Sequence, residues 1–313
     1  MIQVPQFSAQ VNLTTRCNCN CYFCLIEELK RKGIETPKRD LPLQAIHSLI
    51  EQHVEHIHFC GDRGEALFHP ELDRIIDLIK SYGIQISMST NGSVKSTDWW
   101  YEFGKKCTKE DKVVFALDGL EESHKVYRGT DWKTITDNAR AFMKGGGTAV
   151  WKMIVFQHNE KDIPFVKGIS KAMGFKSTWL INSRGYNNRY KKPETRLGKT
   201  RVEVFEEYGC AEVRCRFPRN EQFYVAIDGT VWPCCIIRTI YLCGEAPNIQ
   251  EAIDKDGDYI HILKTPLRYI INNSHLFNTV FENFPHWDYC QIYCNADRTV
   301  IRQVIPNDPE RSL

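Results

Sequence analysis

Three cysteines near the start of the chain have a spacing suited to metal chemistry. Residues 17 to 24 read Cys-Asn-Cys-Asn-Cys-Tyr-Phe-Cys, which places Cys17, Cys21 and Cys24 in one short loop. Three thiolates in such a loop can hold three corners of a 4Fe-4S cluster and leave the fourth iron without a protein ligand. An iron left open in this way can chelate amino and carboxylate groups. The spacing therefore predicts a reactive cluster rather than one limited to electron transfer.

Zinc or inert thiols are the alternative interpretation of this loop. A structural zinc site takes four ligands, usually as two separated pairs, which is not the pattern here. The additional Cys19 lies between two of the predicted ligands. We expect Cys19 to point away from the cluster, and a role for it as an alternative ligand stays open.

The loop resembles the signature of the radical S-adenosylmethionine (SAM) superfamily, in which an aromatic residue precedes the last cysteine. Phe23 occupies that position in this sequence. The resemblance implies a 4Fe-4S cluster that binds SAM at its open iron. It also implies an external electron donor, such as flavodoxin or ferredoxin.

Two further motifs resemble SAM-binding segments of that superfamily. Gly64 and Glu65, within GDRGEALFHPE, match the Gly-Gly-Glu-Pro segment whose backbone receives the amino group of the methionine moiety. The match is imperfect because Ala66 replaces the proline. Thr90 and Asn91 match the Thr-Asn-Gly element near the ribose. The resemblance therefore implies cofactor contacts at all four matching positions.

A third motif follows the next expected strand. Leu-Asp-Gly at 117 to 119, with His124 and Arg128, resembles the stretch in which an arginine pairs with the methionine carboxylate. Arginine suits this task because its planar guanidinium binds a carboxylate through two hydrogen bonds. Ala116 stands where many members have serine, which would remove one polar contact.

A second group of seven cysteines lies between residues 210 and 294. Its pattern resembles the auxiliary-cluster domain called twitch, the short relative of the SPASM domain. The matching positions are Cys215, Cys234, Cys290 and Cys294. The resemblance implies one fully ligated auxiliary 4Fe-4S cluster, which would move electrons or shape the substrate pocket. A zinc site is the alternative. Cys210, Cys235 and Cys243 are either substitute ligands or plain thiols.

Alternating strand and helix patterns are expected to position the first group of motifs. Apolar, β-rich segments occur near residue 11 and at 56–60, 85–90, 113–118, 151–156 and 178–182. Helical patterns cover 41–53, 69–83, 133–144 and 160–173, and Gly83 is expected to cap the second of these. Parallel neighbours need a crossover helix between them. The pattern predicts an α/β fold, a partial (β/α)6 TIM-type barrel whose strand ends bring the motifs to one mouth.

The sequence pattern changes after the last expected strand. We expect the barrel to occupy residues 1–183, a basic linker 184–205, and a small C-terminal iron-sulfur domain of the twitch/SPASM type 206–313. Within the last of these, Asp228-Gly229 predicts a hairpin turn that delivers Cys234 from a strand.

The segment from 184 to 201 is strongly basic, with a single acid, Glu194. Its basic residues are Arg184, Arg189, Lys191, Lys192, Arg196, Lys199 and Arg201. Such a concentration can form a positive rim that attracts an anionic substrate, with Tyr186 and Tyr190 available for stacking. A solvated interdomain linker is the simpler interpretation.

Composition narrows the class of protein. Hydrophobic residues make up 42% and charged residues 26%, which excludes a mainly disordered chain, and a net charge of +2 does not require nucleic acid or an anionic membrane. The first sixteen residues lack a signal-peptide pattern, and no apolar run is long enough for a membrane span. We therefore expect a cytoplasmic protein, in which the thirteen cysteines form no disulfide framework and the clustered ones hold metal.

The function expected from the resemblance is reductive cleavage of SAM to a 5'-deoxyadenosyl radical. That radical would take a hydrogen atom from a small molecule or a peptide, leading to oxidation, epimerisation or cross-linking. Because the cysteine loop begins at residue 17, we expect no separate leader-binding domain ahead of it. The alternatives are a radical SAM enzyme that modifies nucleic acid and a non-catalytic zinc-binding interaction protein.

Overall fold

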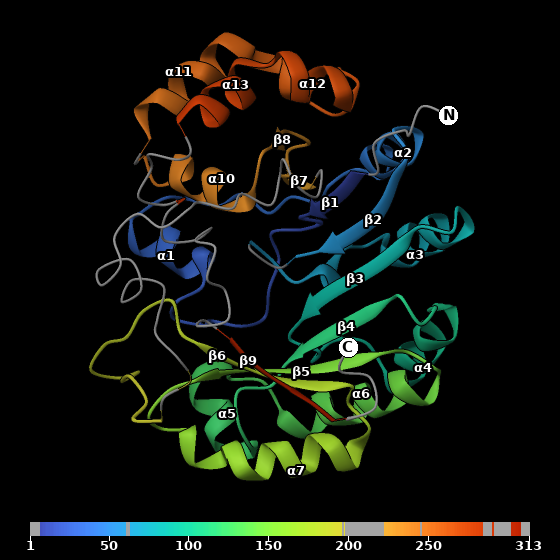
Figure 1. Cartoon of the computed structure of the whole chain (residues 1–313), viewed down its shortest axis with the longest axis vertical. Coiled ribbons are helices and arrows are strands. Elements are labelled where there is room, and N and C mark those ends of the chain that lie inside the picture. The colour runs from blue at the N-terminus through green and yellow to red at the C-terminus, as the bar shows by residue number, and fades with distance from the viewer. Residues whose placement is uncertain are drawn as a thin grey trace. The chain divides into compact units, whose positions relative to one another are not determined.

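The computed structural model of the chain describes residues 7–60, 63–195, 197, 222–244, 246–283, 290 and 302–307 (Figure 1). Strands and helices alternate through the first 182 residues. The strands are β1 (Phe7–Val11), β2 (Val54–Phe59), β3 (Gln85–Thr90), β4 (Lys112–Ala116), β5 (Ala149–Val155) and β6 (Ser177–Asn182). The helices are α1 (Leu25–Arg31), α2 (Leu43–Glu51), α3 (Leu72–Ser81), α4 (Thr97–Lys106), α5 (Glu121–Arg128), α6 (Trp132–Lys144) and α7 (Ile163–Met173). Short 3₁₀ turns, η1 (Ala66–Phe68) and η2 (Glu160–Asp162), precede α3 and α7.

Helices dominate the described part of the chain after residue 221. A short hairpin of β7 (Gln222–Val225) and β8 (Val231–Trp232) comes first. It leads into α10 (Cys235–Leu242), α11 (Pro247–Asp256), η3 (Gly257–Ile260), α12 (Leu267–Asn273) and α13 (His275–Asn283). The last element is the strand β9 (Arg302–Pro306).

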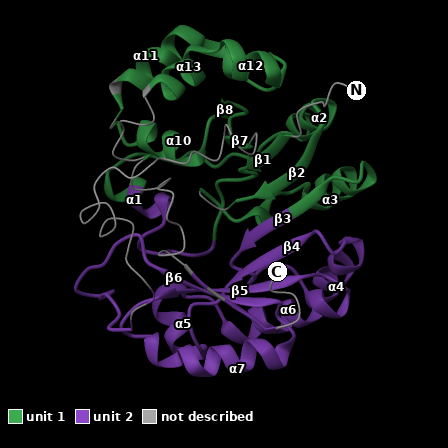
Figure 2. Cartoon of the chain, in the orientation of Figure 1, with its two compact units in different colours: residues 1–17, 29–86, 208–296 green, residues 18–28, 87–207, 297–313 purple. Residues whose placement is uncertain are grey.

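The chain forms two compact units that do not follow sequence order (Figure 2). Unit 1 comprises residues 1–17, 29–86 and 208–296, and unit 2 comprises 18–28, 87–207 and 297–313. The division falls inside β3 and inside the cysteine loop. The domain boundaries expected from the sequence, at 183 and 205, stay a prediction.

Unit 1 carries the strands in the order β8-β7-β1-β2. Strand β1 pairs in parallel with both β2 and β7, while β7 and β8 pair antiparallel. The turn between them closes with a hydrogen bond from the Ala226 amide to the Thr230 carbonyl, and Gly229 has a positive φ of 80°. Glycine adopts that conformation without steric cost. The hairpin predicted at Asp228-Gly229 is confirmed.

Unit 2 contains the parallel run of β3, β4, β5 and β6, with β9 added antiparallel to β6. Helices α4 and α6 cover one face through an aromatic core. The Trp100 ring centroid lies 5.0 Å from that of Phe115 on β4 and 5.9 Å from that of Phe142 on α6. Burial of these large rings stabilises the helix-on-sheet layer.

The six expected strands and four expected helices are all present near their predicted positions. Gly83 follows α3 with a φ of 69°, the left-handed conformation expected of a glycine that ends a helix. The α/β fold, with the parallel sheet of a partial barrel and a C-terminal extension, is therefore confirmed.

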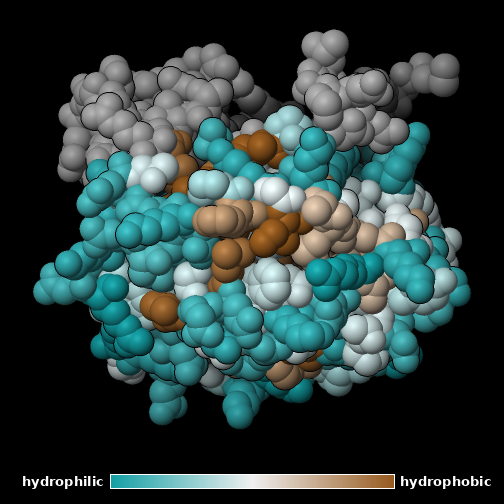
Figure 3. Space-filling model, turned by 90° about the horizontal axis from the view of Figure 1, so that it is seen from below, coloured by the Kyte–Doolittle hydropathy of each residue, from teal (hydrophilic) through white to brown (hydrophobic). Residues whose placement is uncertain are grey.

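The surface in Figure 3 is mostly hydrophilic, with hydrophobic side chains gathered near the middle of that face. Exposed apolar side chains of unit 2 include Phe165 on α7 and Val126 on α5. None of the helices in the described part of the chain is long and apolar enough to cross a bilayer.

Candidate functional site

The cysteine loop connects β1 to α1. Cys17 is exposed, Cys21 is buried and Cys24 is partly buried. The amide of Cys24 donates to the carbonyl of Cys21 at 2.9 Å, and this tight turn leads into α1. Within the described ranges, no three His, Cys, Asp or Glu side chains are grouped to hold a metal ion. The three-cysteine ligand set therefore stays a prediction, supported by the chemistry of the loop.

Cys21 is set up to be a thiolate. Its Sγ accepts a hydrogen bond from Nη1 of Arg128 at 3.5 Å. A hydrogen bond from Cys19 and the positive charge of Arg128 outweigh burial and lower the pKa of the Cys21 thiol to about 6. A thiol with that pKa is mostly ionised at neutral pH, and the thiolate is the form that binds metal. The donor set therefore fits an iron-sulfur cluster.

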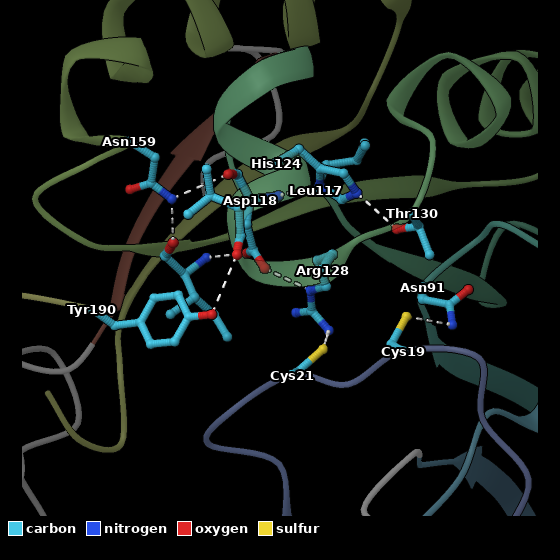
Figure 4. A network of polar contacts seen from close by, with 12 residues as sticks. Cys19, Cys21, Asn91, Leu117, Asp118, His124, Arg128, Thr130, Asn159 and Tyr190 are labelled. Atoms are coloured by element: carbon cyan, nitrogen blue, oxygen red, sulfur yellow. Dashed lines mark hydrogen bonds and ion pairs between the residues drawn. The ribbon is translucent and has the colours of Figure 1, made fainter. Parts of the chain in front are cut away.

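Arg128, the last residue of α5, forms an ion pair with Asp118 (Figure 4). The Arg128 Nε donates to Oδ2 of Asp118 at 2.6 Å, and the Asp118 side chain is fully buried. Burial alone would lower the pKa of Arg128, but the Asp118 charge raises it well above its ordinary value. The other carboxylate oxygen accepts from the amide of Ile154 on β5 at 2.6 Å. This pairing fixes the guanidinium and leaves its Nη2 for a ligand.

Two further side chains fix the turn that carries Asp118. Nδ1 of His124 accepts from the Asp118 amide at 3.1 Å, and its Nε2 lies 2.9 Å from the hydroxyl of Thr130. Burial lowers the pKa of His124 to about 4, so the ring is neutral at physiological pH. Asn159 donates to the Asp118 carbonyl at 3.1 Å. Hydrogen bonds therefore fix the amide, the carbonyl and the carboxylate of Asp118.

Thr90 and Asn91 end β3 and begin the next loop. The Thr90 hydroxyl accepts from the Gly92 amide at 2.9 Å, which shapes the turn. Asn91 Nδ2 lies 2.8 Å from the side-chain oxygen of Asn18 and 3.2 Å from the Cys19 sulfur. The predicted ribose element is thus in contact with the cysteine loop.

The same contacts describe the surroundings of Cys19. Its side chain is buried, hydrogen-bonded by Asn91 and close enough to Cys21 to lower that thiol's pKa. Figure 4 draws both sulfurs on the side of the loop that faces α5 and β3. The expectation that Cys19 points away from the cluster stays a prediction, as does its role as an alternative ligand.

Gly64 and Glu65 lie against the residues that precede Cys17. A Cβ added at Gly64 would stand 1.8 Å from the carbonyl oxygen of Thr14, so only glycine fits. The Glu65 amide donates to the Arg16 carbonyl at 2.8 Å, and the Glu65 side chain is buried. The predicted Gly-Gly-Glu-Pro-like segment is therefore adjacent to the start of the cysteine loop within unit 1.

Phe23 belongs to an aromatic cluster in unit 2. Its ring stacks on Phe156 with centroids 6.3 Å apart, and Tyr190 meets it edge-on at 6.1 Å. Tyr127 packs 4.8 Å from Phe156, and a Cβ at Gly185 would come within 3.1 Å of the Phe23 ring. The aromatic residue of the cysteine motif therefore anchors the loop by packing.

The basic segment is attached to unit 2 over its described part, 184–195. The Gln157 amide donates to the Lys191 carbonyl at 3.0 Å, and the Thr195 amide donates to Glu160 at 2.7 Å. Tyr190 is buried, so its ring is not available to stack on a substrate, and that expectation was wrong. Residues 198–205, with Lys199 and Arg201, and Arg196 lie outside the described residues.

The second cysteine group is only partly described. Cys215 and Cys294 lie outside the described residues, as does Cys210. Cys234 is the N-cap of α10, two residues beyond β8, and Cys290 is buried. The predicted auxiliary ligands therefore stay a prediction.

Sequence reasoning missed the roles of two charged residues of unit 2, Asp118 in the loop after β4 and Lys152 on β5. Asp118 was quoted in a motif without a role, although it orients Arg128. Lys152 was read only as part of an apolar strand, yet it alternates with the fully buried Trp151 and Met153. A single charge at an alternating position of an apolar strand was the available signal for Lys152.

The sequence is similar to one known protein family and to several curated proteins. Residues 11–170 match the family described as the Radical SAM superfamily. A curated "S-adenosylmethionine-dependent nucleotide dehydratase" from a Thermoplasmatales archaeon is 25% identical over 122 residues, 39% of this chain and 41% of that protein. A "Probable GTP 3',8-cyclase" from Thermococcus kodakarensis is 23% identical over 279 residues, 82% of this chain and 84% of the relative. The match thus spans less than half of the dehydratase.

Solved structures share the fold. Streptococcus suis SuiB bound to precursor peptide SuiA gives a TM-score of 0.63 at 12% identity, covering 88% of this chain and 66% of that chain. Native anSMEcpe with bound AdoMet gives a TM-score of 0.59 at 14% identity, covering 94% of this chain and 93% of that chain. BtrN in complex with AdoMet and 2-DOIA gives a TM-score of 0.50 at 15% identity, covering 91% of this chain and 92% of that chain.

Proposed function

The chain belongs to the radical SAM superfamily, and from this premise we propose that it cleaves SAM reductively at a cluster held by Cys17, Cys21 and Cys24. When bound, the cluster supplies the electron that breaks a carbon–sulfur bond of SAM and releases a 5'-deoxyadenosyl radical. The observation that carries the proposal is the low-pKa thiol of Cys21 beside the partly buried guanidinium of Arg128.

The remaining residues of the site would bind and orient SAM. The free donor of Arg128 suits the methionine carboxylate, because a guanidinium already fixed by Asp118 loses little freedom when it binds. The backbone at Gly64 and Glu65 would receive the methionine amino group. Thr90 and Asn91 would lie near the ribose.

An auxiliary 4Fe-4S cluster is proposed for Cys215, Cys234, Cys290 and Cys294, with an external flavodoxin or ferredoxin as electron donor. The position of Cys234 at the N-terminus of α10 supports part of this set, because the helix dipole favours a thiolate there. Two 4Fe-4S clusters would bring the iron content of reconstituted protein to about eight per chain. About four irons would contradict the auxiliary cluster and leave the first cluster unaffected.

A small molecule or a peptide is the proposed substrate class, and abstraction of a hydrogen atom is the proposed reaction. Structural neighbours of both kinds support it. SuiB was solved with its precursor peptide, and anSMEcpe with the Cp18Cys peptide. BtrN was solved with the small molecule 2-DOIA.

Cleavage of SAM in the absence of substrate tests the proposal. Anaerobically reconstituted protein, reduced with dithionite and given SAM, should release 5'-deoxyadenosine and methionine in equal amounts, measured by liquid chromatography and mass spectrometry. The Cys107→Ala variant is the matched control, because Cys107 lies at the C-terminal end of α4, outside both predicted ligand sets. Protein that contains a 4Fe-4S cluster but releases no 5'-deoxyadenosine would contradict the proposal.

A further inference from the structure

Lys152 is a lysine in the middle of a β-strand of unit 2. It pairs in register with Ala116 on β4 and Trp179 on β6. Its neighbour Trp151 points toward the helices, where its ring packs 6.2 Å from Trp132 of α6. Because successive side chains of a strand point to opposite faces, Lys152 lies on the face of the sheet away from α6, which in a barrel is the interior.

The ammonium group of Lys152 has no hydrogen-bond or ion-pair partner among the described residues. Two acidic groups act on it, Asp118 and Cys21. Both oxygens of Asp118 are already bound by Arg128 and the Ile154 amide, and the Cys21 sulfur accepts a hydrogen bond from Arg128. The other charges acting on Lys152 include those of Arg128 and Arg184, both positive. Lys152 therefore adds a third cation to a region whose two anionic groups, Asp118 and Cys21, are both already bound by Arg128.

Placing the Lys152 ammonium beside two other cations costs free energy when no anion is bound. Taking an ammonium out of water without a counter-charge is unfavourable, and nearby like charges increase the cost. Burial, followed by the charge of Arg128, lowers the pKa of Lys152 to about 8, which still leaves it mostly protonated at neutral pH. The small side chain of Ala116 beside it in the sheet offers no atom to pair with the ammonium. An anion bound at this face would relieve the charge imbalance.

We propose that Lys152, with Arg184 as a second cation, binds an oxyanionic group of the substrate at the interior face of β5. The group is a phosphate or a carboxylate, both of which accept hydrogen bonds from an ammonium. Arg184 lies two residues after the end of β6 and is exposed, so its guanidinium is accessible to such a group. The inference rests on the proposed function, because it names the substrate class for the same enzyme.

Binding of anionic probes to the SAM-loaded holoenzyme tests this assignment. The probes are inorganic tripolyphosphate, GTP and a hexapeptide rich in glutamate, measured by anaerobic isothermal titration calorimetry at fixed ionic strength. Lys152→Met should weaken the best-bound probe by about tenfold or more, and Lys152→Arg should recover most of that loss. Lys171→Met, on the exposed surface of α7, should bind the probe like wild type.

The probes also separate the two sources of an oxyanion. A loss for tripolyphosphate and GTP alone would assign a phosphate, and a loss for the peptide alone would assign a carboxylate. Equal affinity in Lys152→Met and wild type would overturn the proposal, as would an equal loss in Lys171→Met or wild type that binds no probe. A loss confined to SAM affinity would also overturn it, because Lys152 would then belong to the cofactor site.

The substrate inference and the proposed function fail in distinguishable ways. Wild type that binds an anion through Lys152 but releases no 5'-deoxyadenosine would contradict SAM cleavage and leave the anion site intact. Wild type that cleaves SAM but binds every probe independently of Lys152 would retain the proposed function and lose the substrate class.

Discussion

Two arginine–aspartate pairs, one in each unit, lie close to cysteines. In unit 2, Arg128 donates to Asp118 at 2.6 Å and its Nη1 donates to the Cys21 sulfur at 3.5 Å. In unit 1, Arg238 donates to Asp228 at 2.5 Å and follows Cys234 by one helical turn. In each pair, ten residues separate the aspartate from the arginine.

The two arginines use their remaining donors differently. Arg238 donates to the Thr230 hydroxyl at 3.1 Å and lies over the Trp232 ring, with 5.0 Å to its centroid. These contacts tie it to the hairpin that precedes Cys234. Arg128 directs a donor at a thiol instead and helps to lower its pKa. The same kind of ion pair therefore stabilises a turn in unit 1 and lowers the pKa of a cysteine in unit 2.

The largest difference between the two regions is expected for the cysteines themselves. Cys21→Ala should abolish SAM cleavage, because it removes a ligand from the cluster with an open iron, and Cys17→Ala should do the same. Cys234→Ala should lower product formation while SAM cleavage persists without coupling to substrate. Quantifying 5'-deoxyadenosine and product in the same reactions checks this. Full SAM cleavage by Cys21→Ala would show that the wrong loop has been assigned.

A smaller but clear effect is expected for the arginines. Arg128→Ala should weaken SAM binding by about 1 to 3 kcal/mol, the value of a charge-assisted hydrogen bond. Asp118→Asn should weaken it less, because the guanidinium stays but is less firmly oriented. Arg238→Ala should reduce thermal stability and leave SAM affinity unchanged. Equilibrium dialysis of SAM against each variant gives the measurement, and equal affinities for Arg128→Ala and wild type would contradict the carboxylate role.

Glycine substitutions provide a third contrast. Gly64→Ala would place a Cβ 1.8 Å from the Thr14 carbonyl, so the backbone before the cysteine loop must move. Gly229→Ala would meet the His261 ring at 2.6 Å and adopt an unfavourable φ of 80°. Both should lower the melting temperature through roughly 1 to 3 kcal/mol of strain. Only Gly64→Ala should also weaken SAM binding, and an unchanged SAM affinity in that variant would argue against the backbone contact.

The smallest effects are expected on stability at acidic pH, where His124 in unit 2 and Asp228 in unit 1 titrate in different pH ranges. The pKa of His124 falls from 6.5 to about 4 on folding, so its stabilising effect is complete above pH 6.5 and is lost as the pH falls toward 4. Burial alone would raise the pKa of Asp228, but Arg238 and Thr230 leave it below 3.8. Its contribution is therefore lost only below about pH 4.

Melting curves between pH 7 and pH 3 check this separation. His124→Gln should flatten the pH dependence in the upper part of that range, and Asp228→Asn should flatten only the acidic end. The reverse assignment, or two variants with the same pH profile as wild type, would contradict it.

Much of the fold could be predicted because it depends on local patterns. The strand expected at 85–90 is the observed β3, and the helix expected at 69–83 contains α3 with its terminal glycine. Helix α5 was not predicted as a helix, since its sequence EESHKVYR contains few apolar residues. It forms where His124 and Tyr127 are buried against the rest of unit 2.

The candidate site could be predicted only in part. Cysteine spacing and strand-end motifs are local, and they indicated the loop, Thr90, Asn91 and Arg128. The contacts that give those residues their properties join distant positions, such as Arg128 with Cys21, which are 107 residues apart. The burial of Tyr190 likewise depends on rings from three other segments. Sequence spacing carries no information on such contacts without the fold.

The assignment of SAM chemistry to the first cysteine loop is tested most directly by electron paramagnetic resonance. A Cys234→Ala/Cys290→Ala double variant, reconstituted and reduced, should show the signal of a single 4Fe-4S cluster, and that signal should change when SAM is added. In Cys21→Ala, any cluster signal that persists should be unaffected by SAM. A SAM-sensitive signal in Cys21→Ala, together with a SAM-insensitive one in the double variant, would place the chemistry at the second group of cysteines and contradict the account.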